Sequence, residues 1–431
     1  MNKKIVFLII IVIIGSCCHF YYQNSTNNKQ QLPTLEPEKN KATISEYYIY
    51  GQHLNMVGVI KSINANFKDI NIIFWNTKTG KMIEYPINYK KNVNIVKFNI
   101  SDEVNDGLFL DNIKKGNYEL YLRFEYQDIN NKNKKKKYKY KYYPLNNETS
   151  YKETTYYTTT KYNNKIMIKS NNNTMIANIT SSKEKKYDIV LDPTAGGIDK
   201  GITANGTNEA TVTLTIAEKV KELLEKEDIK VKLTRTKDSL SEKEYFEEYN
   251  KGGRAVIPHE VNSKYLFSFK VNSSKTPETK GFGIYTADNI NYDFSAKIVE
   301  NIIDKTKLKT STITNHRVDY GIYTHNFTES EIAENMAYYD SKGYKRYNVT
   351  TKSNYMYMIR EPGGIITGAY VDNSNPDKIG VNKYYNSNVG VESYIIELGY
   401  LTNKEDFNAM TNNKDAYAEA IASSIIEELK E

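Results

Sequence analysis

The strongest constraint on the fold of this 431-residue chain is an apolar run that ends in a glycine-rich turn. Residues 187–191 have the composition of a buried strand, and the turn 192–197 (DPTAGG) follows directly. Asn208 is a residue type that caps helices, and after it apolar side chains recur at helical spacing. Segments typical of strands and of helices then alternate to the C-terminus, which predicts an α/β domain over residues 187–431.

The preceding region has a different pattern. Short apolar or alternating runs separated by turn residues fill residues 43–165, a spacing typical of an all-β sandwich. The approach to Tyr118 resembles that of a penultimate strand in immunoglobulin-like domains, where a tyrosine hydroxyl bonds back to the preceding backbone. We therefore expect an immunoglobulin-like sandwich at 43–165 and a linker at 166–186.

The N-terminus has the pattern of an export signal. Two lysines precede the apolar run 5–14, and small residues follow it up to Cys17. This ending resembles a bacterial lipobox, in which the cysteine, here Cys17, is lipidated. A single-span anchor or a cleaved signal stays open as the alternative, because residues 20–22 are aromatic and extend the apolar run.

These alternatives agree on where the protein works. Residues 1–22 are expected to be a signal or membrane anchor and 23–42 a polar linker, so the folded part lies at the extracytoplasmic face of the bacterial membrane. Cys17 and Cys18 are the only cysteines, which excludes a disulfide framework or a cysteine metal site in the folded part.

The net charge of +7 is modest for this length, and seven lysines between residues 132 and 141 supply much of it. This run is interpreted as a solvated hairpin tip, with contact to anionic lipid or wall polymer as the functional alternative. Nucleic acid is not an expected partner of an exported chain.

Several short motifs of residues 187–431 occur in a characteristic order. After the turn come Glu209 at a helix start, then Arg235, Arg254, the segment 358–360 (MIR) and the segment 397–403 (ELGYLTN). In this order they resemble the zinc-dependent N-acetylmuramoyl-L-alanine amidases of the amidase_3 type. The resemblance implies a three-layer α/β domain with a mostly parallel sheet. Residues 326–390 exceed what the family pattern needs and are interpreted as an insertion.

The resemblance fails at two positions where the family carries zinc-ligand histidines. Ala195 and Lys270 stand there, while Glu209 keeps the third ligand position and Glu397 that of the general base. The family chemistry needs three protein ligands and an open position for water, whose pKa the metal lowers. Because a methyl and an ammonium group cannot supply the missing ligands, we expect no zinc cofactor and vestigial roles for both glutamates.

Four further residues are carried over as groove or substrate contacts: Arg235, Arg254, Asn272 and Arg360. For Lys270 we expect an ion pair with one of the two glutamates, the alternative being a side chain directed to solvent. His259, His316 and His325 are the alternative metal ligands in this region.

The sequence thus predicts a membrane-tethered, non-catalytic amidase-like protein that binds peptidoglycan or an extracytoplasmic protein partner. An active N-acetylmuramoyl-L-alanine amidase with a non-standard metal site is the alternative from the enzyme class. A structural surface lipoprotein that binds no glycan is the third hypothesis.

Overall fold

A computed structural model describes residues 35–64, 66–101, 107–127, 138–171, 174–184, 186–197, 199–237, 252–288, 290–324, 328–341, 356–364 and 388–430. Residues Leu35–Glu431 form one compact unit. None of the helices in the described ranges is both long enough and apolar enough to cross a bilayer. The export signal and the lipidation site predicted at Cys17 lie outside the described residues.

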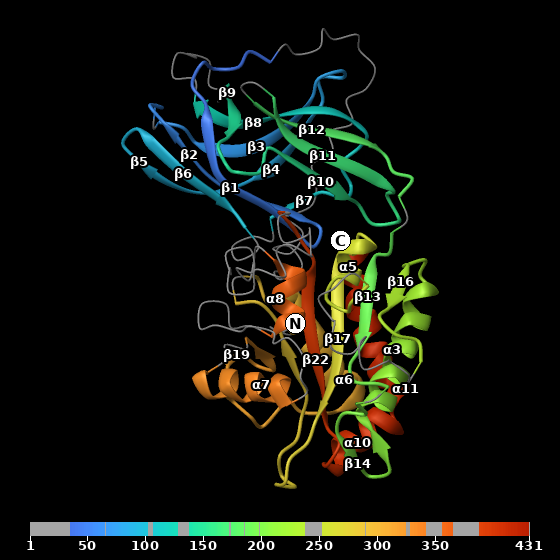
Figure 1. Ribbon diagram of the computed structural model, residues 1–431. Helices are drawn as coiled ribbons and strands as arrows, with labels where there is room; N and C mark the ends of the chain where they lie inside the picture. The colour runs from blue at the N-terminus through green and yellow to red at the C-terminus, as the bar shows by residue number, and fades with distance from the viewer. Residues whose placement is uncertain are drawn as a thin grey trace, which may run out of the picture. The chain divides into compact units, whose positions relative to one another are not determined.

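The described residues between 35 and 181 form strands and connecting loops but no helix, and we call them the β region (Figure 1). Its strands are β1 (Ala42–Tyr50), β2 (His53–Lys61), β3 (Asp69–Asn76), β4 (Met82–Pro86), β5 (Asn88–Asn92), β6 (Ile95–Ile100), β7 (Leu108–Phe109), β8 (Gly116–Gln127), β9 (Tyr138–Asn147), β10 (Glu153–Tyr157), β11 (Asn164–Asn171) and β12 (Thr174–Ser181). They pair mainly in the order β10-β11-β12-β8-β9-β1-β2-β6-β5, and β9 connects two groups of strands by pairing with β8 and β1. Alternating side chains from these strands form one apolar core.

Two expectations for the β region have different outcomes. The Tyr118 hydroxyl donates a 2.8 Å hydrogen bond to the Lys114 carbonyl, as the sequence predicted. The immunoglobulin-like class itself is not confirmed and stays a prediction. Residues 166–186, interpreted as a linker, instead contain most of β11 and all of β12, because Ile166, Ile168 and their partners alternate into the core.

The remainder of the chain is an α/β domain. Its elements are β13 (Ile189–Pro193), β14 (Thr203–Ala204), β15 (Thr207–Asn208), α3 (Glu209–Glu225), β16 (Val231–Leu233), α5 (Ile257–Glu260), β17 (Tyr265–Asn272), β18 (Gly283–Tyr285), α6 (Asp293–Thr306), β19 (Arg317–Asp319), β20 (Ile322–Tyr323), α7 (Glu329–Ser341), α8 (Tyr357–Gly363), β21 (Val389–Gly390), β22 (Glu392–Tyr400), α10 (Lys404–Thr411) and α11 (Lys414–Lys430). Helix α11 packs against α3 and α6, and α8 packs against β22. Of the predicted insertion 326–390, the structure describes α7, α8 and β21 with a few adjoining residues.

The main sheet of this domain has seven strands in the order β16-β13-β17-β22-β18-β20-β19. Strands β16, β13, β17 and β22 are parallel, but β18 runs antiparallel to β22, and β19 antiparallel to β20. The prediction of a mostly parallel sheet is therefore wrong, and the sheet is mixed. A parallel connection needs a crossover of a dozen or more residues, and the link from Asn272 to Gly283 is shorter than that.

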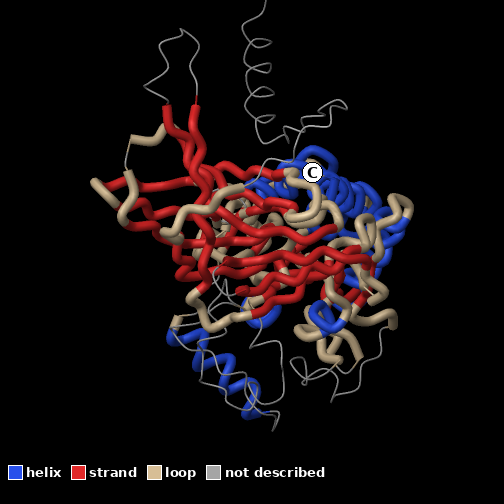
Figure 2. The backbone as a smooth tube through the Cα atoms, turned by 90° about the horizontal axis from the view of Figure 1, so that it is seen from above, coloured by secondary structure: helices blue, strands red, loops and turns tan. Residues whose placement is uncertain are grey.

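The β region and the α/β domain share strand pairing. The short strand β21 adds in parallel to β1, with Ile49 opposite Val389 and Tyr50 opposite Gly390. Tyr50 belongs to the apolar core of the α/β domain, although it lies in β1. Figure 2 shows the strands of both regions in red. The β region is thus joined to the α/β domain by backbone hydrogen bonds and by a common core.

Candidate functional site

The candidate site lies where the parallel strands of the main sheet end. Thr194 follows β13, Asn272 ends β17, and Glu397 lies near the end of β22. The register pairs Pro193 with Phe269 and Lys270 with Glu397, so these strand ends meet at one edge of the sheet. Ligands of open α/β sheets bind at the carboxyl edge, which is why this edge is the place to examine.

Glu209 opens helix α3 and points at this edge. The side chain of Asn208 caps the helix by accepting a hydrogen bond from the Thr211 amide. The Thr194 hydroxyl lies 2.8 Å from Glu209 Oε1 and 2.6 Å from the Phe269 carbonyl, and it shares its single proton between these two acceptors. The amide of Ile202 donates to Glu209 Oε2 at 3.3 Å. The amide of Val271 adds a 3.4 Å contact to Oε1. Both carboxylate oxygens of Glu209 therefore have protein partners.

The turn that carries Ala195 has an unusual backbone. Ala195 adopts a φ of +60°, a left-handed conformation that is costly for a residue with a Cβ atom. Gly201, with a φ of +65°, lies against Glu209: a Cβ atom there would come within 2.4 Å of Glu209 Oε2. The turn is thus folded closely around Glu209, and Ala195 contributes a buried methyl group to it.

Glu397 lies on the other side of β17. The side-chain amide of Asn272 donates to Glu397 Oε2 at 2.6 Å, so these two predicted residues are in contact. Tyr285 of β18 is hydrogen-bonded to the same carboxylate. Burial, followed by the charge of Glu397 and its hydrogen bond, raises the pKa of Tyr285 well above its usual value. The Tyr285 hydroxyl therefore keeps its proton.

Lys270 does not form the expected ion pair. Its backbone is in register with Glu397, which places both side chains on one face of the sheet. Within the described residues, however, the Lys270 side chain makes neither a hydrogen bond nor an ion pair, and it is partly exposed to solvent. Glu209 is occupied by Thr194 and backbone amides, and Glu397 by Asn272 and Tyr285, so neither carboxylate depends on the lysine.

Arg254 forms a buried ion pair with Asp192. Its Nε and Nη2 donate to the two oxygens of Asp192 at 2.7 and 2.6 Å, and both residues are buried. Thr234 and Ser268 also donate to Asp192. Burial raises the pKa of Asp192. The charge of Arg254 and the hydrogen bonds from Arg254, Thr234 and Ser268 lower this pKa by more, so the net shift is downward.

The other two arginines are also buried. Arg235 donates to the carbonyls of Pro193 at 2.9 Å and Ala210 at 2.7 Å, which ties the end of β13 to the first turn of α3. Arg360 forms an ion pair with Glu361 at 3.0 Å inside α8. The described contacts of these guanidinium groups are to backbone carbonyls and neighbouring carboxylates, and the assignment of Arg235, Arg254 and Arg360 to a substrate groove stays a prediction.

The histidines of this domain do not converge on the edge. His259 Nε2 lies 3.1 Å from the Pro362 carbonyl and so joins α5 to α8. Burial lowers the pKa of His259 to about 4, which keeps the ring neutral. His316 lies 3.9 Å from Glu331 of α7, and His325 is outside the described residues.

The donor set of this edge does not fit a zinc ion. Zinc requires three protein ligands of the thiolate, imidazole or carboxylate type directed at one point. The described residues contain no group of three such side chains. Ala195 offers a methyl group, Lys270 an ammonium group, and Glu209 Oε1 is engaged by Thr194.

Two residues of the site make contacts with the glutamates that the sequence did not predict. Thr194 is the hydrogen-bonding partner of Glu209, and Tyr285 is that of Glu397. Thr194 adjoins Ala195, so a hydroxyl next to an absent ligand was the available signal. Tyr285 had no such signal, because its contact depends on β18 pairing antiparallel with β22.

Comparisons with known proteins agree with this architecture. The model of the N-acetylmuramoyl-L-alanine amidase family Amidase_3 matches residues 189–427, more than half of the chain. The amidase AmiA of Salmonella typhimurium is 31% identical over 111 residues, which cover 26% of this chain and 36% of that protein. The chain thus spans about a third of that curated relative. The chain is a member of the N-acetylmuramoyl-L-alanine amidase family.

Two solved structures have similar folds. The amidase AmiC2 of Nostoc punctiforme is 23% identical with a TM-score of 0.37, over 57% of this chain and 99% of that one. The CwlD amidase of Clostridioides difficile, solved in complex with the GerS lipoprotein, is 19% identical with a TM-score of 0.35, over 57% and 99% of the two chains.

Proposed function

We propose that this chain is an exported, membrane-tethered member of the amidase family whose α/β domain binds peptidoglycan without cleaving it. Family membership supports a role at the cell wall. The observation that carries the non-catalytic part is the occupation of Glu209 by the Thr194 hydroxyl and by backbone amides, beside a methyl group at Ala195. A carboxylate with these partners stabilises the local structure of the turn.

The binding part of the proposal rests on the residues around Glu397, which lie across β17 from Glu209. Asn272, Glu397 and Tyr285 form a connected polar group next to the partly exposed Lys270. Tyr285 is partly exposed and stacks on the buried Tyr323 with ring centroids 5.1 Å apart, which holds one aromatic ring beside the polar groups. Hydroxyl, amide and aromatic groups together suit the sugars and peptide stems of a glycan polymer.

Binding is tested on the segment Leu35–Glu431, which contains all the described structure. Sedimentation with purified peptidoglycan should pull down the wild type, and Asn272→Ala should weaken binding about tenfold. Asn412→Ala in an exposed turn after α10 is the matched control and should bind as the wild type does. Wild-type protein that stays in the supernatant would contradict peptidoglycan binding and favour an extracytoplasmic protein as partner.

Catalysis is tested separately. The wild type should bind no stoichiometric zinc in calorimetric titration and release no peptide stems from muropeptides. Tight binding of one zinc together with chelator-sensitive cleavage would establish the active-enzyme alternative and overturn the proposal.

The lost ligands can also be put back. Ala195→His with Lys270→His should create measurable zinc affinity, while neither single change should, because two protein ligands make a weak chelate. If the double variant binds zinc no better than the wild type, Ala195 and Lys270 do not stand at ligand positions.

A further inference from the structure

The four neighbouring strands β1, β2, β6 and β5 have a strongly basic outer face. Three of their four lysines lie on this face together with the single acidic residue of these strands, Glu46, which is opposite Val57. The fourth, Lys91, is on the other face, where its ammonium group lies over the Phe67 ring. Lys90 of β5 lies directly opposite Lys97 of β6, and Lys97 lies opposite Val59 of β2. Lys61 is two residues beyond Val59 and so projects from the same face. We call the surface formed by Lys61, Lys90, Lys97 and the connecting turn at Val93 the β5–β6 face.

Within the part of the chain that the structure describes, no ion pair compensates the lysines of the β5–β6 face. Lys61, Lys90 and Lys97 are exposed, and within the described residues their side chains form no ion pair or hydrogen bond. Like charges directly opposite one another in a sheet are destabilising. The pair Lys90 and Lys97 therefore gives up stability in the isolated protein, and an anionic surface would recover it.

An apolar component accompanies the lysines. Val93, at the turn between β5 and β6, has 83% of its surface exposed. Val57, Val59 and Ile95 are partly exposed on the same face, among the lysines. A soluble polyanion would gain nothing from an exposed valine at the tip, whereas a lipid interface accepts apolar side chains below the level of the headgroups. The combination favours a bilayer over an anionic wall polymer.

The chain enters the described structure beside this face. The side chain of Asn40 donates a hydrogen bond to the Lys61 carbonyl, and Pro37 bridges to Tyr142 of β9. The preceding residues include the apolar run 5–14. We propose that the β5–β6 face docks onto an anionic lipid bilayer, with Lys61, Lys90 and Lys97 at the headgroups and Val93 inserted into the interface.

The test uses the segment Leu35–Glu431, so that the apolar run 5–14 cannot itself bind lipid. Co-sedimentation with vesicles of phosphatidylcholine and phosphatidylglycerol should show binding that weakens with added salt, and vesicles of phosphatidylcholine alone should bind poorly. Lys61→Glu with Lys90→Glu and Lys97→Glu should reduce the affinity about 100-fold, given the usual gain per lysine at an anionic surface. Val93→Asp should reduce it about fivefold.

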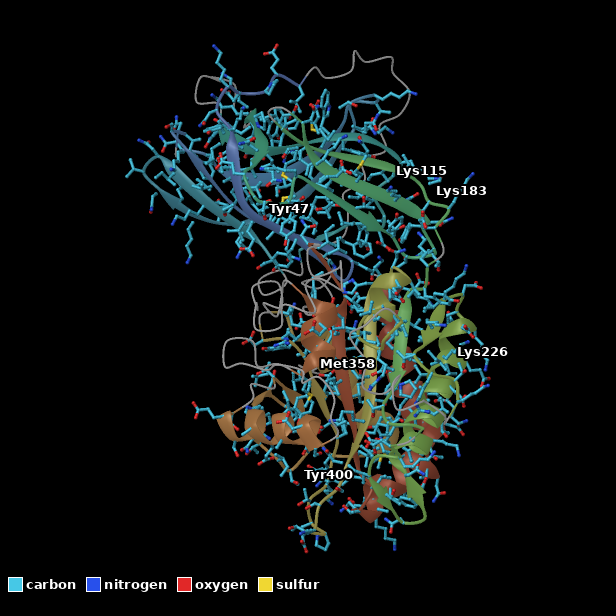
Figure 3. All side chains as sticks on the ribbon, viewed as in Figure 1. Tyr47, Lys115, Lys183, Lys226, Met358 and Tyr400 are labelled. Atoms are coloured by element: carbon cyan, nitrogen blue, oxygen red, sulfur yellow. The ribbon has the colours of Figure 1, made fainter. Side chains whose placement is uncertain are left out.

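A charge-matched control separates docking from net charge. Lys115→Glu with Lys183→Glu and Lys232→Glu makes the same charge change at exposed lysines elsewhere, and Figure 3 labels two of them, Lys115 and Lys183, far from β5 and β6. This control should keep binding within about threefold of the wild type, since surface charges beyond a Debye length are screened. Equal losses in the two triple variants would overturn the assignment of the face.

Polyphosphate in place of vesicles distinguishes the two anionic partners. If the Lys61, Lys90 and Lys97 variant loses polyphosphate binding while Val93→Asp leaves vesicle binding unchanged, the face binds a soluble polyanion and the bilayer proposal is wrong. Absence of binding to anionic vesicles would overturn it as well. These readouts do not depend on zinc or peptidoglycan, so they are independent of the function proposed above.

Discussion

The two ends of the parallel strands β13, β17 and β22 differ sharply in how their polar groups are satisfied. At the amino ends, Asp188 and Lys264 are buried, 3% exposed each, and lie against the β region. Asp188 accepts hydrogen bonds from the amide and hydroxyl of Thr160 at 2.6 and 2.5 Å. Lys264 Nζ lies 4.2 Å from the centre of the Tyr156 ring. At the amino ends, Asp188 and Lys264 therefore each have a partner from the β region.

The carboxyl ends are arranged differently. Glu209 and Glu397 have partners, but Lys270 has none within the described residues, and Ala195 holds a left-handed backbone. The comparison shows that buried charged groups at the amino ends contact the β region, whereas the buried glutamates at the carboxyl ends have their partners within the α/β domain. The β region is then part of the α/β fold, where the sequence suggested a module connected by a linker.

The largest expected effect is at the amino ends. Asp188→Ala removes the acceptor for Thr160 and for the Lys230 amide, and leaves Asp111 as the remaining carboxylate near the buried Lys264. Removing one partner of a buried charged network typically costs about 3–5 kcal/mol. We expect a loss of this size in the free energy of unfolding, measured by urea titration.

The control for this prediction is an aspartate in a surface ion pair. Asp304, paired with Lys307 in a highly exposed position, should cost under about 1 kcal/mol when changed to alanine. If Asp188→Ala and Asp304→Ala give similar unfolding curves, the amino-end contacts do not hold the two regions together, and the contrast between the two ends disappears.

The second effect is a pH dependence of stability. Burial lowers the pKa of Lys264 to about 8, although Asp111 and Asp188 oppose this. Between this value and the ordinary lysine pKa near 10.4, the unfolded chain binds more protons than the folded chain, so this group makes stability rise with pH. We expect the wild type to gain about 1–2 kcal/mol relative to Lys264→Met between pH 8 and 9.5.

Lys270, at the carboxyl ends of the strands, provides the comparison with Lys264. Lys270 is partly exposed and has no ion pair among the described residues, so Lys270→Met should change the free energy of unfolding by less than about 1 kcal/mol. A flat difference between the wild type and Lys264→Met would show that Lys264 is hydrated in the folded protein and that the amino ends are as open as the carboxyl ends.

Much of this arrangement follows from the sequence. The apolar run before the glycine-rich turn, the cap at Asn208 and the order of Glu209 and Glu397 predicted the α/β domain and brought both glutamates to one edge. These features depend on local periodicity and on strand order, which a sequence displays. The sequence also assigned Asn272 and Glu397 to the site, but it did not predict the hydrogen bond between them.

The remaining features depend on pairings across long sequence separations. The sequence did not predict that β21 adds to β1 or that β18 runs antiparallel to β22, because neither pairing has a local signal. The three arginines were assigned to a groove because an arginine in a family motif does not reveal its acceptor. Arg254, for example, reaches Asp192 across many residues of chain.

The smallest expected effect concerns the turn at the carboxyl ends. Ala195 has a φ of +60°, and the left-handed conformation costs a residue with a Cβ about 1–2 kcal/mol. Glycine avoids that cost but loses about 0.4–1 kcal/mol through its larger unfolded-state entropy. Ala195→Gly should therefore stabilise the protein by up to about 1 kcal/mol, whereas Ala296→Gly inside helix α6 should destabilise it by about 1 kcal/mol. Urea unfolding of the two variants measures whether each substitution raises or lowers the free energy of unfolding. Destabilisation by Ala195→Gly comparable to that by Ala296→Gly would mean that the buried methyl group holds the turn, which would make the carboxyl end as well packed as the amino end.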